Sequence, residues 1–129
     1  MLDILNTGVR NVRNIGRFIF DNGAIGELEG ILSERRNSVT SSVAFLIDEY
    51  FERHPNVLGT LPCDQNDQLI YVSTAFEPTT EYIDQLLEQV RLGSGVKPCA
   101  VVGIGGGTTL DTAKAISNLL TNGGQSEDY

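Results

Sequence analysis

The chain has 129 residues, with 9 lysines and arginines against 17 aspartates and glutamates, a formal net charge of −8 at pH 7. This acidic balance argues against a general nucleic-acid binder, which needs a clustered basic surface to displace counterions. An apolar share of 40% can build the core of about one domain. No apolar run approaches the roughly 18 residues that span a bilayer, and the first residues lack the pattern of a secretory leader. We therefore expect a cytoplasmic protein without membrane contact.

Few residues of this sequence can supply a catalytic centre. It has one histidine, His54, and two well-separated cysteines, Cys63 and Cys99. A metal site built from several imidazoles therefore cannot be assembled within the chain, and neither a zinc knuckle nor a disulfide framework is indicated. We predict that the chain does not complete a reaction alone, and we assign it no catalytic residue and no metal ligand.

The first half of the chain predicts two strands and one helix. Residues 12–20 look extended, and a turn then leads to a helix over residues 24–36, where apolar residues recur at helical spacing. Residues 42–48 are a short apolar run of the kind that fills the middle of a parallel sheet. Residues 49–68 carry proline, glycine and asparagine, so we expect a loop with one helical turn at 49–53.

The second half continues the alternation of strands and helices. Residues 69–74 predict a strand, and residues 79–92 a helix with an apolar stripe of period 3.6. A strand from Cys99 then runs into three glycines. The last helix is expected from Thr109 to about Leu120, with these residues buried: Leu110, Ala113, Ile116 and Leu120. Such alternation implies a parallel sheet. With three convincing central strands, its edge needs cover from another piece of chain, or the sequence is a fragment.

The strongest motif is the run from Val101 to Lys114, in which a buried strand ends, three glycines turn the chain and a helix begins. Glycines let the backbone approach a ligand without a Cβ in the way. The first helical turn offers unpaired N–H groups and a partial positive charge, so the run predicts a phosphate or diphosphate site. Thr108 would cap the helix, and Asp111 would complete a capping box. The plainer alternative is a tight turn that uses glycine only for packing.

The run GIGGGTTLDTAKAI, residues 103–116, resembles the glycine motif of the iron-containing alcohol dehydrogenases, a family whose wider superfamily includes glycerol dehydrogenase and dehydroquinate synthase. Weaker similarities follow the family order at residues 20–28, 45–48 and 77–79. The resemblance covers the whole chain, but roughly the front third of a family member. It implies an α/β fold with a Rossmann-like parallel sheet and flanking helices. Residues 1–129 would be an N-terminal NAD(P)-binding domain, incomplete without a C-terminal helical domain.

The resemblance also implies roles for individual residues. Gly106, Gly107 and Thr108 would hold the cofactor diphosphate through backbone N–H groups and the threonine hydroxyl. Asp111 would lie near the nicotinamide, and Lys114 would stay close to the site. Each has a plainer interpretation, since Asp111 can serve as a helix cap and Lys114 as a solvated helix residue.

A carboxylate at the end of a central strand completes this set. By the resemblance, Asp48 would accept hydrogen bonds from the adenosine ribose, and its charge would favour NAD over NADP. Without the glycine motif, Asp48 would be interpreted as a carboxylate that happens to follow a strand. Glu77 stands where the family has asparagine, so no contact is transferred to it.

The resemblance finally implies a reaction. The family's metal, iron or zinc, is held by one aspartate and three histidines of the C-terminal domain, where the substrate also binds. The chain would thus be the cofactor-binding part of a metal-dependent, NAD(P)-linked dehydrogenase of primary or secondary alcohols, homo-oligomeric when complete. The phrase LIDEYFERHP, residues 46–55, looks like the branch that oxidises the 8-hydroxyl of 3-deoxy-octulosonate, a sugar acid. The alternatives are a non-catalytic nucleotide-binding module that needs a partner chain, and a lyase that uses NAD transiently.

Overall fold

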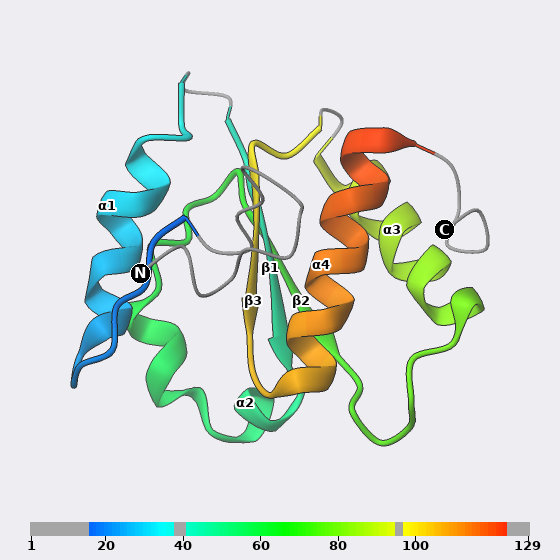
Figure 1. The fold of residues 1–129 in the computed structure, drawn as a ribbon, viewed down its shortest axis with the longest axis horizontal. Coiled ribbons are helices and arrows are strands. Elements are labelled where there is room, and N and C mark those ends of the chain that lie inside the picture. Colours follow the sequence, from blue (N-terminus) through cyan, green and yellow to red (C-terminus); the bar gives the residue numbers. More distant parts are fainter. Residues whose placement is uncertain (1–15, 38–40, 95–96, 124–129) are drawn as a thin grey trace, which may run out of the picture.

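The computed structural model describes residues 16–37, 41–94 and 97–123. In these residues three parallel strands form a sheet in the order β2-β1-β3 (Figure 1). The strands are β1 (Val43–Asp48), β2 (Gln68–Val72) and β3 (Ala100–Ile104). The α/β class with a parallel sheet is therefore confirmed. Because β1 pairs on both sides and its apolar residues are buried, it is the centre of the fold.

Helices cover both faces of the sheet. On one face lie α3 (Thr80–Ser94) and α4 (Gly107–Asn122), which pack on Ala44 and Leu46 of β1. The opposite face, which includes Phe45 of β1, is covered by shorter elements. These are η2 (Ala24–Glu27), α1 (Leu28–Ser33), α2 (Tyr50–Arg53) and η3 (Pro55–Thr60). Alternate residues of β1 thus enter two separate cores, as expected for a strand buried on both faces.

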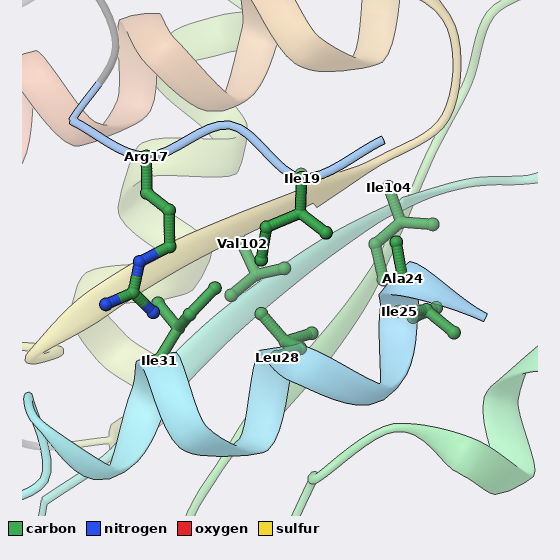
Figure 2. Close-up of a pocket in the computed structure, with 9 residues that line it drawn as sticks. Arg17, Ile19, Ala24, Ile25, Leu28, Ile31, Val102 and Ile104 are labelled. Carbon is green, nitrogen blue, oxygen red and sulfur yellow. The ribbon is translucent and has the colours of Figure 1, made fainter. Parts of the chain in front are cut away.

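The strand predicted over residues 12–20 is wrong where the structure describes it. Residues 12–15 of that prediction lie outside the described part, and residues 16–20 pair with none of the described strands. Phe18 and Phe20 are 76% and 90% exposed, and their rings stack on each other at 6.3 Å. Alternate side chains, Arg17 and Ile19, line a cavity of about 350 Å³ beside α1 and β3 (Figure 2). Arg17 and Ile19 thus line this cavity while Phe18 and Phe20 face solvent, and the segment joins no strand ladder.

Two predicted helices have different bounds in the structure. The helix expected over residues 24–36 begins as a 3-10 turn and ends at Ser33. The helical turn expected at residues 49–53 is present as α2, but the loop that was expected to follow it contains the additional 3-10 helix η3. In contrast, α3 follows its predicted stripe, with Leu86, Leu87 and Val90 buried.

An ion pair fixes the amino end of β1 to the loop before β2. The buried carboxylate of Asp67 accepts hydrogen bonds from Arg36 at 2.9 and 2.6 Å, from the backbone N–H of Val43 at 2.8 Å and from that of Asp64 at 2.9 Å. Burial by itself raises the pKa of Asp67, but the hydrogen bonds from Arg36 and the backbone outweigh it and lower that pKa below its usual range. The charged form of Asp67 therefore stabilises the fold.

We expect Asp67→Asn to lower the free energy of unfolding at pH 7 by about 2 kcal/mol, because Arg36 loses its buried charged partner. A group whose folded pKa is lowered contributes stability at neutral pH and loses it on acidification, here from about pH 4 downwards. The variant should lose less stability than the wild type over that acidic range. Urea denaturation at several pH values measures both effects. Asp64→Asn, a neighbouring exposed carboxylate 3.5 Å from Arg36, is the control and should cost less than about 1 kcal/mol.

Candidate functional site

The carboxyl ends of the three strands bring polar groups from distant parts of the chain together. β1 ends at Asp48, β2 leads to Thr74, and β3 runs into Gly105. The Asp48 Oδ1 atom accepts hydrogen bonds from the backbone N–H of Tyr50 at 2.9 Å and from the Thr74 hydroxyl at 3.4 Å. In open parallel sheets this edge is where ligands bind, above all between strands whose connections leave in opposite directions. Here that point lies between β1, which is followed by elements on one face of the sheet, and β3, which is followed by α4 on the other face. Asp48 and Gly105 lie at the ends of these two strands.

Two glycines allow β3, α4 and the end of β1 to approach closely. A Cβ placed on Gly103 would lie 2.8 Å from the Ala113 Cβ atom, so this glycine lets α4 pack directly on β3. A Cβ on Gly105 would lie 2.8 Å from Thr109 Oγ1 and 2.9 Å from the Asp48 Cβ atom. Gly105 also has a φ of +152°, a backbone conformation that residues other than glycine rarely adopt. The sequence alone did not distinguish these packing glycines from the ones that follow.

The next two glycines face open space. A Cβ atom added to Gly106 or Gly107 would meet no atom of another part of the chain within 4 Å. Gly106 is the N-cap of α4, and no side chain caps this helix end. The first N–H groups of an α-helix have no intrahelical partner and lie at its positive end. The exposed backbone at Gly106 and Gly107 therefore offers donors that an anion can reach.

A buried hydroxyl without a partner lies directly behind this turn. Thr109 is 0% exposed, and its Oγ1 atom has no hydrogen-bond partner among the described residues. Most buried hydroxyl groups are hydrogen-bonded, and an unsatisfied one costs about 1–3 kcal/mol. Sequence reasoning missed Thr109 as a site residue. The available signal was the second threonine after the glycines, which becomes buried once the helix begins two residues earlier than predicted.

The earlier start of α4 corrects two further predictions. Because Gly106 is the N-cap, Thr108 lies inside the first turn, and the capping box between Thr108 and Asp111 is not formed. Instead, the Thr108 carbonyl accepts a hydrogen bond from the Thr112 hydroxyl at 2.8 Å. Leu110, predicted to be buried, is 42% exposed. Thr109 and Thr112 occupy the buried positions instead.

The remaining predicted site residues lie on another side of α4. Asp111 and Lys114 are exposed, whereas Thr109, Thr112 and Ile116 face the sheet. With 100° between successive residues, Asp111 and Lys114 fall on the same helix face as Gly107 and opposite the buried one. The structure therefore brings Asp48, the glycine turn and Thr108 to one edge, and it does not bring Asp111 and Lys114 toward Asp48. Their roles stay predictions.

The described residues supply no metal centre. Among them, no three His, Cys, Asp or Glu side chains are grouped so that they could hold an ion. Nor does any helix in the described ranges have the length and apolar character needed to cross a membrane. The groups that gather at this edge, the backbone N–H donors of α4 and the carboxylate of Asp48, can bind an anion and hydroxyl groups.

Comparison with known protein families agrees with this geometry. The sequence model of the iron-containing alcohol dehydrogenases matches residues 16–129. The match includes β1, β3, the glycine turn and α4, which together form the edge described above.

The two kinds of glycine in the turn should respond differently to a methyl group. We expect Gly105→Ala to lower the free energy of unfolding by about 3 kcal/mol, because the added Cβ meets Thr109 and Asp48 and the positive φ becomes strained. Gly106→Ala, with a φ of −83° and open space around it, is the matched control and should leave stability nearly unchanged. Thermal unfolding of both variants by circular dichroism gives the comparison. Equal stability of the two would contradict the packing role of Gly105.

Proposed function

The chain belongs to the iron-containing alcohol dehydrogenase family, and we propose that the carboxyl edge of its sheet binds NAD for the oxidation of an alcohol. Family members are oxidoreductases, and membership indicates a metal-dependent, alcohol dehydrogenase-like function. The observation that supports NAD binding most strongly is the close approach of Gly105 to Asp48. Because of this approach, the helix start that would bind an anion lies beside the carboxylate that would bind hydroxyl groups. A dinucleotide carries a diphosphate and a ribose diol in this same succession.

The diphosphate would be held at the start of α4. The backbone N–H groups of Gly106, Gly107 and Thr108 would donate to its oxygens, and the dipole of this 16-residue helix would favour the negative charge. Open space at Gly106 and Gly107 leaves room for the ligand. The unpartnered hydroxyl of Thr109 fits the same assignment, since a ligand or its bound water would supply the missing hydrogen bond.

The adenosine ribose would be held by Asp48. Its Oδ1 atom already accepts two hydrogen bonds, which orient the carboxylate. Its Oδ2 atom has no such bond from the described residues, so it can accept from the two ribose hydroxyls. A 2′-phosphate at this place would be repelled by the carboxylate, and NAD is therefore the proposed cofactor over NADP.

The hydride transfer and the metal are proposed from the chemistry of alcohol oxidation and not from contacts seen in this chain. When bound, NAD accepts the hydride that leaves the alcohol carbon. Asp111 and Lys114 would lie toward the nicotinamide half, on the exposed face of α4. The described residues do not fit the family's metal, iron or zinc, so we propose that it is held by residues other than these. These 129 residues would bind and orient the cofactor.

The substrate proposal stays at the level of a primary or secondary alcohol, sugar-acid hydroxyls included. The segment that resembles the 3-deoxy-octulosonate 8-oxidase branch forms the end of β1, α2 and the residues after it. It contains Asp48 and continues on the side where the adenosine would bind. Its sequence therefore bears on the cofactor more than on the hydroxyl to be oxidised.

A side chain in the proposed diphosphate site should block the cofactor without unfolding the chain. We expect Gly107→Val to weaken NAD binding about tenfold or more, because the branched side chain occupies the space before the helix N–H groups. Isothermal titration calorimetry measures the affinity. Gly30→Val, in α1 and likewise surrounded by open space, is the control and should bind NAD as the wild type does. Unchanged affinity of Gly107→Val would refute the diphosphate assignment.

The carboxylate of Asp48 should set the preference between the two dinucleotides. We expect Asp48→Asn to reduce the ratio of NAD to NADP affinity about tenfold, since the charge that repels the 2′-phosphate is removed while the shape is kept. Titrations with each dinucleotide give the ratio. Glu88→Gln on the exposed side of α3 removes the same charge far from the edge and should leave it unchanged. An unaltered ratio in Asp48→Asn would place the ribose elsewhere.

A further inference from the structure

Two stacked aromatic rings follow Asp48 immediately. The rings of Tyr50 and His54, at the two ends of the short helix α2, are 4.0 Å apart and nearly parallel, with 10° between their planes. Phe51 meets the Tyr50 ring edge-on at 5.2 Å. A contact of 3.0 Å between His54 Nδ1 and the Tyr50 carbonyl fixes the histidine further. The stack is therefore held in place without a ligand.

This stack faces solvent and is not part of the hydrophobic core. Tyr50 is 55% exposed and His54 is exposed, whereas the neighbouring Phe51 packs against the buried cluster beneath the sheet. A cavity of about 360 Å³ lies here, and its lining includes Asp48, Thr74, Tyr50 and His54. The exposed rings thus border the same space as the carboxylate proposed to bind the ribose.

We propose that Tyr50 and His54 form the adenine subsite, an inference that rests on the proposed NAD site. The base is attached to the same ribose whose hydroxyls Asp48 would bind, so it must lie close to that carboxylate. A planar purine can extend the stack of Tyr50 and His54 as a third ring. Stacking of a base on an aromatic side chain contributes about 1–3 kcal/mol by alanine substitution.

The charges around the cavity agree with a neutral base. Its lining includes the carboxylates of Glu49 and Glu52 besides Asp48, against the single guanidinium of Arg53. Acidic groups disfavour a further phosphate here, whereas uncharged adenine is not repelled. The diphosphate would lie on the other side of Asp48, at the start of α4. The adenine and the diphosphate of ADP would thus bind at two separate sites, one aromatic and one formed by backbone N–H groups.

The first experiment separates the base from the rest of the nucleotide. ADP and ribose 5-phosphate share the sugar and a phosphate but only ADP carries adenine. We expect Tyr50→Ala to weaken ADP binding by the chain about tenfold, with ribose 5-phosphate affected little. Tyr50→Phe keeps the ring and should retain ADP affinity. Phe20→Ala removes an exposed ring from a different part of the surface and is the matched control.

A fluorescence experiment tests the contact directly. The sequence contains no tryptophan, so Tyr50→Trp introduces a single reporter that preserves a flat ring. Stacking of adenine should quench this tryptophan in proportion to the ADP bound, whereas ribose 5-phosphate should not. In Phe20→Trp the fluorescence should not respond to either ligand. This variant pair keeps the proposal testable if Tyr50→Ala does not fold.

The outcomes distinguish this inference from the proposed function. If the wild-type chain binds neither ADP nor NAD, the NAD site itself is wrong and the subsite with it. If the wild type binds ADP, but Tyr50→Ala binds it equally well or the tryptophan is not quenched, only the adenine subsite is wrong. Equal weakening of ADP and ribose 5-phosphate in Tyr50→Ala would also overturn the subsite, because it would show a structural effect on Asp48.

Discussion

The close approach of β3, α4 and the end of β1 is the constraint on which the proposed site depends. Gly103 leaves no Cβ between β3 and Ala113, and Gly105 leaves none between the turn and the pair Thr109 and Asp48. Any side chain at these places would move α4 outward and separate its first N–H groups from the carboxylate of β1. The proposed anion site and the proposed hydroxyl site are therefore neighbours because glycines occupy the two positions where side chains would separate them.

The same close approach explains why the site contains an unsatisfied group. Thr109 is buried because α4 begins at Gly107, which turns this hydroxyl toward Gly105 and away from solvent. A methyl-bearing residue without the hydroxyl would fill that space with no desolvation of a polar atom. Instead, the unpaired Oγ1 atom of Thr109 destabilises the fold at a position next to the glycine turn. Such an arrangement is understandable where a bound ligand or water completes the hydrogen bonds.

Local sequence patterns predicted the elements in which the spacing of apolar residues alone indicates which side chains are buried. The apolar run of β1 and the stripe of α3 needed no knowledge of partners. The strand prediction for residues 12–20 was wrong, since a short apolar segment that looks extended need not pair with a sheet and can line a cavity instead. In the proposed site, the glycines could be singled out from their position between a strand and a helix, whereas Asp48 was assigned only through the family resemblance. Thr109 could not be singled out, because a shift of the helix start by two residues decides which threonine is buried.

The sign of the charges decides which part of a ligand this edge can select. The chain has a net charge of −8, and carboxylates outnumber cations around the cavity beside Asp48. Attraction for a diphosphate must therefore come from backbone N–H groups and the helix dipole, which act only within the first turn of α4. A free phosphate gains that short-range interaction alone and meets the surrounding negative charge. In the proposed site a dinucleotide would add ribose hydroxyls for Asp48 and a neutral base for the rings beyond it, so we expect its affinity to exceed that of the phosphate it contains.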